Sequence, residues 1–141
     1  MGFGSALLAQ ECGNFCELDW WKTVTVADVQ ADLKAGANPN AQHEFGHTPL
    51  HGAARGGTLA LLRTLLDAGA DPNLADNYVN TALHWAASFG ISANIQALVD
   101  AGADASSQSD SGKTPWELTR ENHQIKDSTA YLTLKNAHFS K

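Results

Sequence analysis

The chain has 141 residues, of which 43% are hydrophobic and 17% charged, a composition typical of one folded domain and not of a disordered chain. Nine Lys and Arg against fifteen Asp and Glu give a formal net charge of −6 without any basic run, which argues against nucleic-acid binding. No apolar run approaches the roughly 18 residues of a membrane span, so membrane insertion is not expected.

The first ten residues, MGFGSALLAQ, are apolar and rich in small side chains. They are similar to the end of a secretory signal peptide, with Ala9 as the last residue before cleavage. The positively charged start of such a signal is missing, so a disordered N-terminus is the other interpretation. We expect residues 1–15 to form a tail. The signal-like sequence favours an exported or periplasmic location over a cytoplasmic one.

Two cysteines, Cys12 and Cys16, stand in the stretch CGNFC. Gly13 and Asn14 favour a turn that could bring the two sulfur atoms into disulfide range in an oxidising compartment. In the cytosol the same residues would be two ordinary thiols. A metal site would need further ligands nearby, and the local sequence has none, so we expect no metal or other cofactor.

A repeat dominates the rest of the chain. TPLHGAARGGTLALLRTLLDAGADPN (48–73) and TALHWAASFGISANIQALVDAGADAS (81–106) are identical at half of their positions. Thr48, Thr81 and Thr114 recur every 33 residues. Such a period predicts stacked units, each of which needs its neighbours to bury its apolar face.

Each unit has start and stop signals for two helices. Thr48 and Pro49 predict an N-cap and the first residue of a helix that ends near Gly56. Thr58 predicts the cap of a more apolar helix that ends at Gly69. The polar run that follows predicts a hairpin-like loop, or finger, between units.

These motifs resemble the ankyrin repeat, from roughly Cys16 to the C-terminus. The resemblance implies a mainly α solenoid of about four helix-turn-helix units joined by hairpin-like loops. Trp20 and Trp21 stand where an Ala pair normally lies, which predicts that these large side chains cover the open N-terminal end of the stack. Residues 128–139 predict a long closing helix. The expected divisions of the domain 16–141 are an N-terminal capping unit 16–45, repeats 46–78 and 79–111, and a C-terminal capping unit 112–141.

Several residues depart from the ankyrin pattern. Gly52 and Trp85 replace the usual Leu, and Ala82 replaces the helix-starting Pro. Val79 stands where the finger normally has Gly, and Ser92 stands where an apolar residue is expected. These changes predict a less regular third unit with a differently bent finger. We expect Trp85, on the inner side of its helix, to lie in the core.

Histidines are the first candidates for site chemistry. His43, His47 and His51 recur every four residues, but Gly46 and Pro49 prevent one continuous helix, so a metal site is not expected. His51 and its counterpart His84 match the ankyrin histidine, which the resemblance implies is structural. No nucleophile elbow or phosphate-binding glycine loop is present, so we expect no enzyme.

The resemblance implies a non-enzymatic module, an adaptor or inhibitor, that binds another protein through the finger tips and the inner helices of a concave face. Phe45, Tyr78 and Phe89 are aromatic where the motif requires no aromatic residue, which suits interface anchors; packing on the neighbouring finger is the alternative. The acidic residues of this face, Glu44, Asp76 and Asp110, favour a basic partner, and we expect a monomer. The expected partner-binding residues are Glu44, Phe45, His47, Arg55, Asn77, Tyr78, Asn80, Ser88, Phe89, Asp110, Ser111 and Lys113.

An alternative function of another class is a small redox or metal-dependent stress protein that uses Cys12, Cys16 and the finger histidines. The compact size and export-like start are also similar to small bacterial ankyrin proteins placed outside the cytoplasm. The sequence does not identify the partner.

Overall fold

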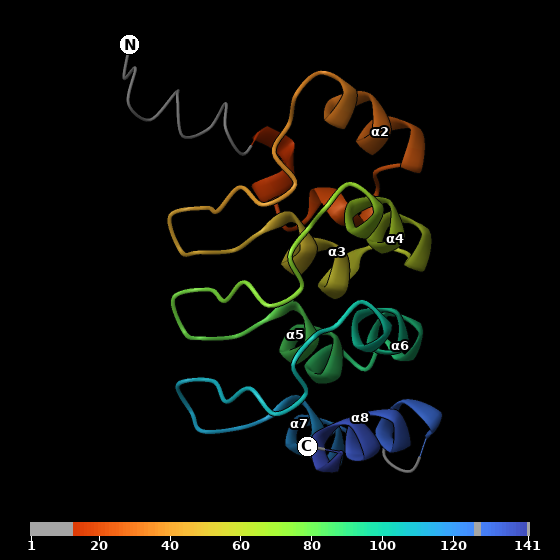
Figure 1. The fold of residues 1–141 in the computed structure, drawn as a ribbon. Helices are drawn as coiled ribbons and strands as arrows, with labels where there is room; N and C mark the ends of the chain where they lie inside the picture. The colour runs from red at the N-terminus through yellow and green to blue at the C-terminus, as the bar shows by residue number, and fades with distance from the viewer. Residues whose placement is uncertain (1–12, 126–127, 141) are drawn as a thin grey trace.

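The computed structural model describes residues 13–125 and 128–140, which form α-helices, two short 3-10 helices and no strand. Figure 1 shows pairs of helices stacked in one direction from the N-terminus to the C-terminus, with long loops that all project to the same side. The helices are η1 (Gly13–Cys16), η2 (Trp20–Lys22), α2 (Val26–Lys34), α3 (Pro49–Gly56), α4 (Leu59–Asp67), α5 (Ala82–Phe89), α6 (Ser92–Asp100), α7 (Pro115–Glu121) and α8 (Thr129–Phe139).

The helices form two rows. In the inner row, next to the loops, η2 packs on α3, α3 on α5 and α5 on α7. In the outer row α2 packs on α4, α4 on α6 and α6 on α8. One apolar core runs between the rows, and fully buried leucines such as Leu62, Leu83 and Leu98 belong to it. The expected solenoid of paired helices is therefore confirmed.

The helices begin where the periodic threonines predict. Thr48, Thr81 and Thr114 each accept a hydrogen bond from the third backbone N–H of the helix that follows. Thr58 caps α4 in the same way, whereas Ile91 before α6 provides no side-chain cap. The predicted closing helix is α8.

The N-terminal end of the inner row is closed by Trp21. Its side chain is only 1% exposed, and its indole N–H donates to the Phe15 carbonyl over 3.0 Å. The ring lies so close to α3 that a Cβ atom at Gly52 would overlap Trp21 Cδ1. Gly52 replaces the usual Leu because Trp21 fills the space that the larger side chain would take.

The prediction of a differently bent finger in the third unit is wrong. Val79 has a φ of 60°, in the same left-handed region as Gly46 at 82° and Gly112 at 78°. Its N–H donates to the Asp76 carbonyl over 2.9 Å, the bond that Gly46 makes to His43 over 2.7 Å. The backbone bonds of the finger therefore impose the turn in spite of the β-branched side chain.

Candidate partner-binding face

Three fingers form a row beside the inner helices: finger one (43–47), finger two (76–80) and finger three (109–113). Each is closed by a backbone bond between its first and last residues, as from His43 N–H to the His47 carbonyl over 2.8 Å. Neighbouring fingers are also bonded to each other, because Asn77 N–H donates to the Phe45 carbonyl and Asp110 N–H to the Tyr78 carbonyl, both over 2.9 Å. The fingers thus form one connected surface.

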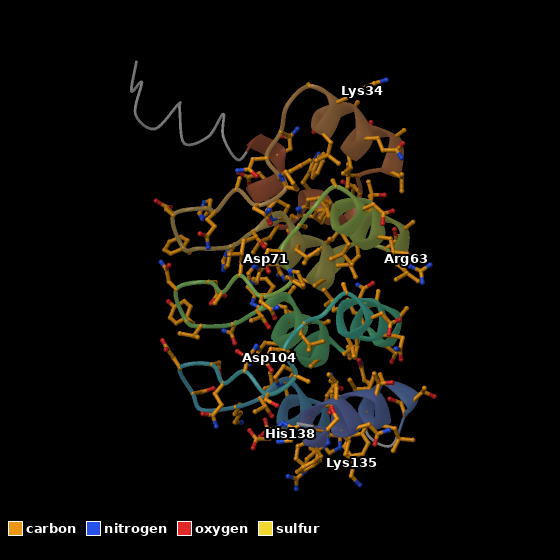
Figure 2. All side chains as sticks on the ribbon, in the orientation of Figure 1. Lys34, Arg63, Asp71, Asp104, Lys135 and His138 are labelled. Atoms are coloured by element: carbon orange, nitrogen blue, oxygen red, sulfur yellow. The ribbon has the colours of Figure 1, made fainter. Side chains whose placement is uncertain are left out.

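The loops that follow α4 and α6 are held by matching asparagine and aspartate residues. Asn40 Nδ2 donates to the Gly69 carbonyl over 3.1 Å, and Asn73 makes the equivalent bond to Gly102. Asp71 and Asp104 accept from backbone N–H groups two residues later. Figure 2 shows these two aspartates at equivalent places one unit apart, between the fingers and the helices. These aspartates hold the turns.

Two of the expected aromatic anchors lie at the finger tips. Phe45 is 50% exposed and Tyr78 is 60% exposed, so neither belongs to the core. The side chains of other finger residues are also exposed: Glu44, Asn77, Asp110 and Ser111.

Some of the expected binding residues already have partners within the chain. Asn77 Nδ2 donates to the Glu44 carbonyl over 3.1 Å. Lys113 Nζ forms an ion pair with Glu121 at 2.6 Å, and the Ser111 hydroxyl lies 2.8 Å from that of Ser109. These side chains stabilise the face itself, which reduces what they can offer a partner.

An open groove lies between finger two and the C-terminal ends of α3 and α5, with a volume of about 360 Å³. Four of the expected residues line it, and three further residues that the sequence analysis did not assign to the face complete it. The lining consists of Arg55, Asn80, Ser88 and Phe89, and of Leu18, His84 and Trp85. Phe89 is 50% exposed here.

Trp85 was expected in the core, but it is only half-buried and lines the groove. Its indole N–H donates to Asp76 Oδ2 over 3.2 Å, and its ring meets that of His47 edge-on at 4.8 Å. The spacing of Trp85 and Phe89, one helical turn apart, could have placed both on one face.

Asp76 is the anchor of this arrangement. Its side chain is buried, Oδ1 accepts from the backbone N–H groups of Tyr78 and Asn80, and Oδ2 lies 3.7 Å from His47 Nε2. Because the carboxylate is buried and bonded, Asp76 does not offer its charge to a partner. Burial lowers the pKa of His47, an effect that the nearby Asp76 carboxylate opposes.

His51 and His84 have the structural role that the resemblance implied. Nδ1 of His51 accepts from Thr48 N–H over 3.0 Å, and Nε2 donates to the Asn80 carbonyl over 2.7 Å. His84 makes the equivalent bonds to Thr81 and to the Lys113 carbonyl. This network fits the neutral Nε2–H tautomer. Burial lowers the pKa of both histidines, although their bonds to carbonyl groups oppose the shift.

The described residues contain no group of three or more His, Cys, Asp or Glu side chains that could hold a metal ion. The structure describes neither Cys12 nor the side chain of Cys16, so their pairing stays a prediction. No helix in those two ranges is both long and apolar enough to cross a bilayer.

A comparison with family models identifies the family of the repeats. Residues 26–109 match the family model described as ankyrin repeats (3 copies). These residues run from the first residue of α2 to the first residue of finger three, which is more than half of the 141 residues. No curated protein matches the chain.

Proposed function

The chain belongs to the ankyrin-repeat family, and from this premise we propose that it is an adaptor or inhibitor that binds one partner protein on the face made by the fingers and the inner helices. Ankyrin repeats are generally protein-protein interaction modules, and the family is typically non-enzymatic. The proposal assigns the binding to a particular face.

A continuous row of aromatic rings carries this proposal. The distances between successive ring centroids are 5.4 Å from Phe45 to His43, 6.2 Å from His43 to His47, 4.8 Å from His47 to Trp85 and 6.4 Å from Trp85 to Phe89. We name Phe45, His43, His47, Trp85 and Phe89 the aromatic row. Its two ends, Phe45 and Phe89, are half-exposed, and large exposed aromatic side chains are favoured anchors of protein interfaces.

The scaffold beneath the aromatic row is already ordered. The bonds between fingers and the buried carboxylate of Asp76 fix the loops before any partner arrives. A partner therefore loses little of its binding free energy to ordering these loops.

Affinity capture tests the proposal. The chain and a Phe45→Ala, Tyr78→Ala, Phe89→Ala variant serve as baits in extracts of the source organism. A Leu132→Ala, Phe139→Ala variant is the matched control, because both residues are at least 50% exposed but lie on α8. Circular dichroism verifies that all three proteins are folded.

We expect one protein to be captured by the chain and by the α8 control, and to be lost with the triple variant. Its dissociation constant should rise about 100-fold or more in the triple variant, since single aromatic anchors contribute about 2 kcal/mol. Equal capture by all three baits would contradict the proposal.

A further inference from the structure

Arg55 differs from the other charged side chains on the binding face. It lies near the C-terminal end of α3, and its guanidinium carbon is 5.5 Å from the centre of the Phe89 ring on α5. A guanidinium over a ring keeps its in-plane N–H donors available for another group. Arg55 is therefore held in place by the next unit without using its donors.

No acidic side chain among the described residues is paired with Arg55. The lysine ion pairs there join Lys22 to Asp19 and Lys113 to Glu121. Lys22 lowers the pKa of the exposed Asp19 carboxyl, and Arg55 adds only a smaller effect. Within the described part of the chain, the charge of Arg55 is therefore largely uncompensated.

Among the described residues that line the groove, Arg55 is the one with a formal charge at neutral pH. Leu18, Trp85 and Phe89 give it an apolar wall, and Asn80 and Ser88 are neutral. His84 is neutral because burial lowers its pKa. The groove has a volume of about 360 Å³, which is near the lower end for ligand pockets and suits a few side chains but not a whole helix.

We propose that this groove receives a short extended segment of the partner that places an Asp or Glu carboxylate on Arg55, next to a large apolar side chain on Phe89 and Trp85. The inference rests on the proposed function and specifies the chemistry of its partner. A planar guanidinium binds a carboxylate through two parallel hydrogen bonds, and one cation matches one carboxylate charge. A doubly charged phosphate would be only half neutralised.

This assignment differs from the basic partner that the acidic residues of the face suggested. Asp76, one of those residues, is buried and bonded to Trp85, so its charge is not presented to the groove. Glu44 and Asp110 lie at the finger tips, and neither lines the groove. The charge that a segment in the groove would meet is therefore positive.

A displayed library of random peptides, selected on the full chain and counter-selected on the triple variant, tests the proposal. We expect the enriched peptides to share an Asp or Glu beside an aromatic or large aliphatic residue. One enriched peptide is then synthesised with a fluorophore, together with its Glu→Gln form and a form with phosphoserine in place of Glu. Binding is measured by fluorescence anisotropy.

Arg55→Ala should raise the dissociation constant of the acidic peptide about 10- to 100-fold, as expected for a charge-assisted hydrogen-bonded pair. On the unchanged protein, the Glu→Gln peptide should have a dissociation constant higher than that of the acidic peptide by a similar factor. Replacing Arg55 with Ala should raise the dissociation constant of this Gln peptide only a little further. Arg55→Lys should recover only part of the loss, since lysine lacks the planar fork. The control is Arg63→Ala, which makes the same charge change on α4, on the outer side of the stack away from the fingers (Figure 2), and should have no effect.

Other outcomes overturn the inference in separate ways. Enriched peptides that are basic or lack an acidic residue, or that bind Arg55→Ala unchanged, contradict the carboxylate assignment but leave binding on this face intact. Tighter binding of the phosphoserine form would assign the groove to phosphorylated partners instead. If no peptide is enriched on the chain over the triple variant, the proposed face fails together with the carboxylate assignment.

Discussion

At the scale of single residues, the backbone of Val79 is strained, whereas the equivalent residues of the other two fingers are glycines, Gly46 and Gly112. Val79 has a left-handed backbone with a φ of 60°, which a β-branched residue rarely adopts. Its side chain is 41% exposed, so packing recovers little of that cost. Val79→Gly should therefore raise the free energy of unfolding by about 0.5–1 kcal/mol, after the larger entropy of glycine in the unfolded chain is subtracted. Urea unfolding measures the change.

Gly112 provides the reverse test. It stands at the equivalent place in finger three with a φ of 78°, and a Cβ there would meet nothing within 4 Å. Gly112→Val adds conformational strain, part of which the smaller entropy of valine in the unfolded chain offsets, so it should lower the free energy of unfolding by about 0.5–1 kcal/mol. A Val79→Gly variant no more stable than the unchanged chain would mean that the finger tolerates valine without cost.

A second property at this scale is the acid sensitivity of the buried histidines. His51 Nδ1 accepts from a backbone N–H, so a proton on that nitrogen would break the bond. Burial lowers the pKa values of His47, His51 and His84 below 6.5, the value for an exposed imidazole. Below pH 6.5 the unfolded chain binds protons that the folded chain does not, so the free energy of unfolding should decrease as the pH falls. Well above that pH the contribution of the three neutral histidines to the free energy of unfolding is fully present.

Urea titrations between about pH 7.5 and about pH 5.5 test this slope. His51→Gln removes one of the three groups and should flatten the dependence on pH, even though the variant is less stable at every pH. A slope that is the same in the unchanged chain and in His51→Gln would assign the acid sensitivity to other groups.

At the scale of elements, the contact of η2 with α3 depends on one missing side chain. Alanine normally stabilises a helix relative to glycine by about 0.5–1 kcal/mol. At Gly52 the added Cβ would overlap the buried Trp21 ring, so Gly52→Ala should lower the free energy of unfolding by about 1–3 kcal/mol. Thermal unfolding measures the loss.

The sign of this effect should depend on Trp21. In a Trp21→Ala background the space beside Gly52 is open, so Gly52→Ala should become neutral or stabilising, and the two changes should be strongly non-additive. Gly56→Ala is the control in the same helix, because the three atoms nearest to the added Cβ all belong to the exposed and flexible Lys22 side chain. A destabilisation by Gly52→Ala that persists without Trp21 would contradict the proposed contact.

The helices could be predicted from the sequence because their signals are local. The threonine caps, Pro49 and the left-handed glycines act within one turn of the backbone. Their regular recurrence was therefore enough to predict the pairs of helices. The finger of Val79 was misjudged because bonds to Asp76 and to finger three override the local preference of valine. Trp85 was misplaced because its exposure depends on Asp76, nine residues earlier, and on His47 in the preceding finger.

The groove itself could not be predicted from one repeat. Arg55 and Phe89 come from successive units, and Leu18 comes from the irregular segment between η1 and η2. Their approach depends on the distance between stacked units and on the fold of the capping segment, neither of which a sequence period contains. The chemical character of this groove therefore depends on side chains that neighbouring units contribute together.

At the scale of the whole molecule, the stack predicts a gradient of stability. Units in the middle are covered by neighbours on both sides, whereas α2 and α8 close the ends of the outer row and have a neighbouring unit on one side only. In a linear stack the free energy of local opening is set by the unit and its adjacent interfaces. Amide hydrogen exchange should therefore be slowest in α3 to α6 and faster in α2 and α8.

Two core substitutions distinguish this gradient from uniform cooperativity. Leu134 in α8 and Leu83 in α5 are both fully buried, and replacing either with Ala should cost about 2–5 kcal/mol. Leu134→Ala should reduce amide protection in α7 and α8 while α3 and α4 keep theirs, because the end unit can open alone. Leu83→Ala should reduce protection throughout, because it weakens the interfaces on both sides of α5. If Leu134→Ala reduced the protection of every helix equally, the chain would unfold as one unit, and the partner-binding face could not loosen at one end while it remains folded at the other.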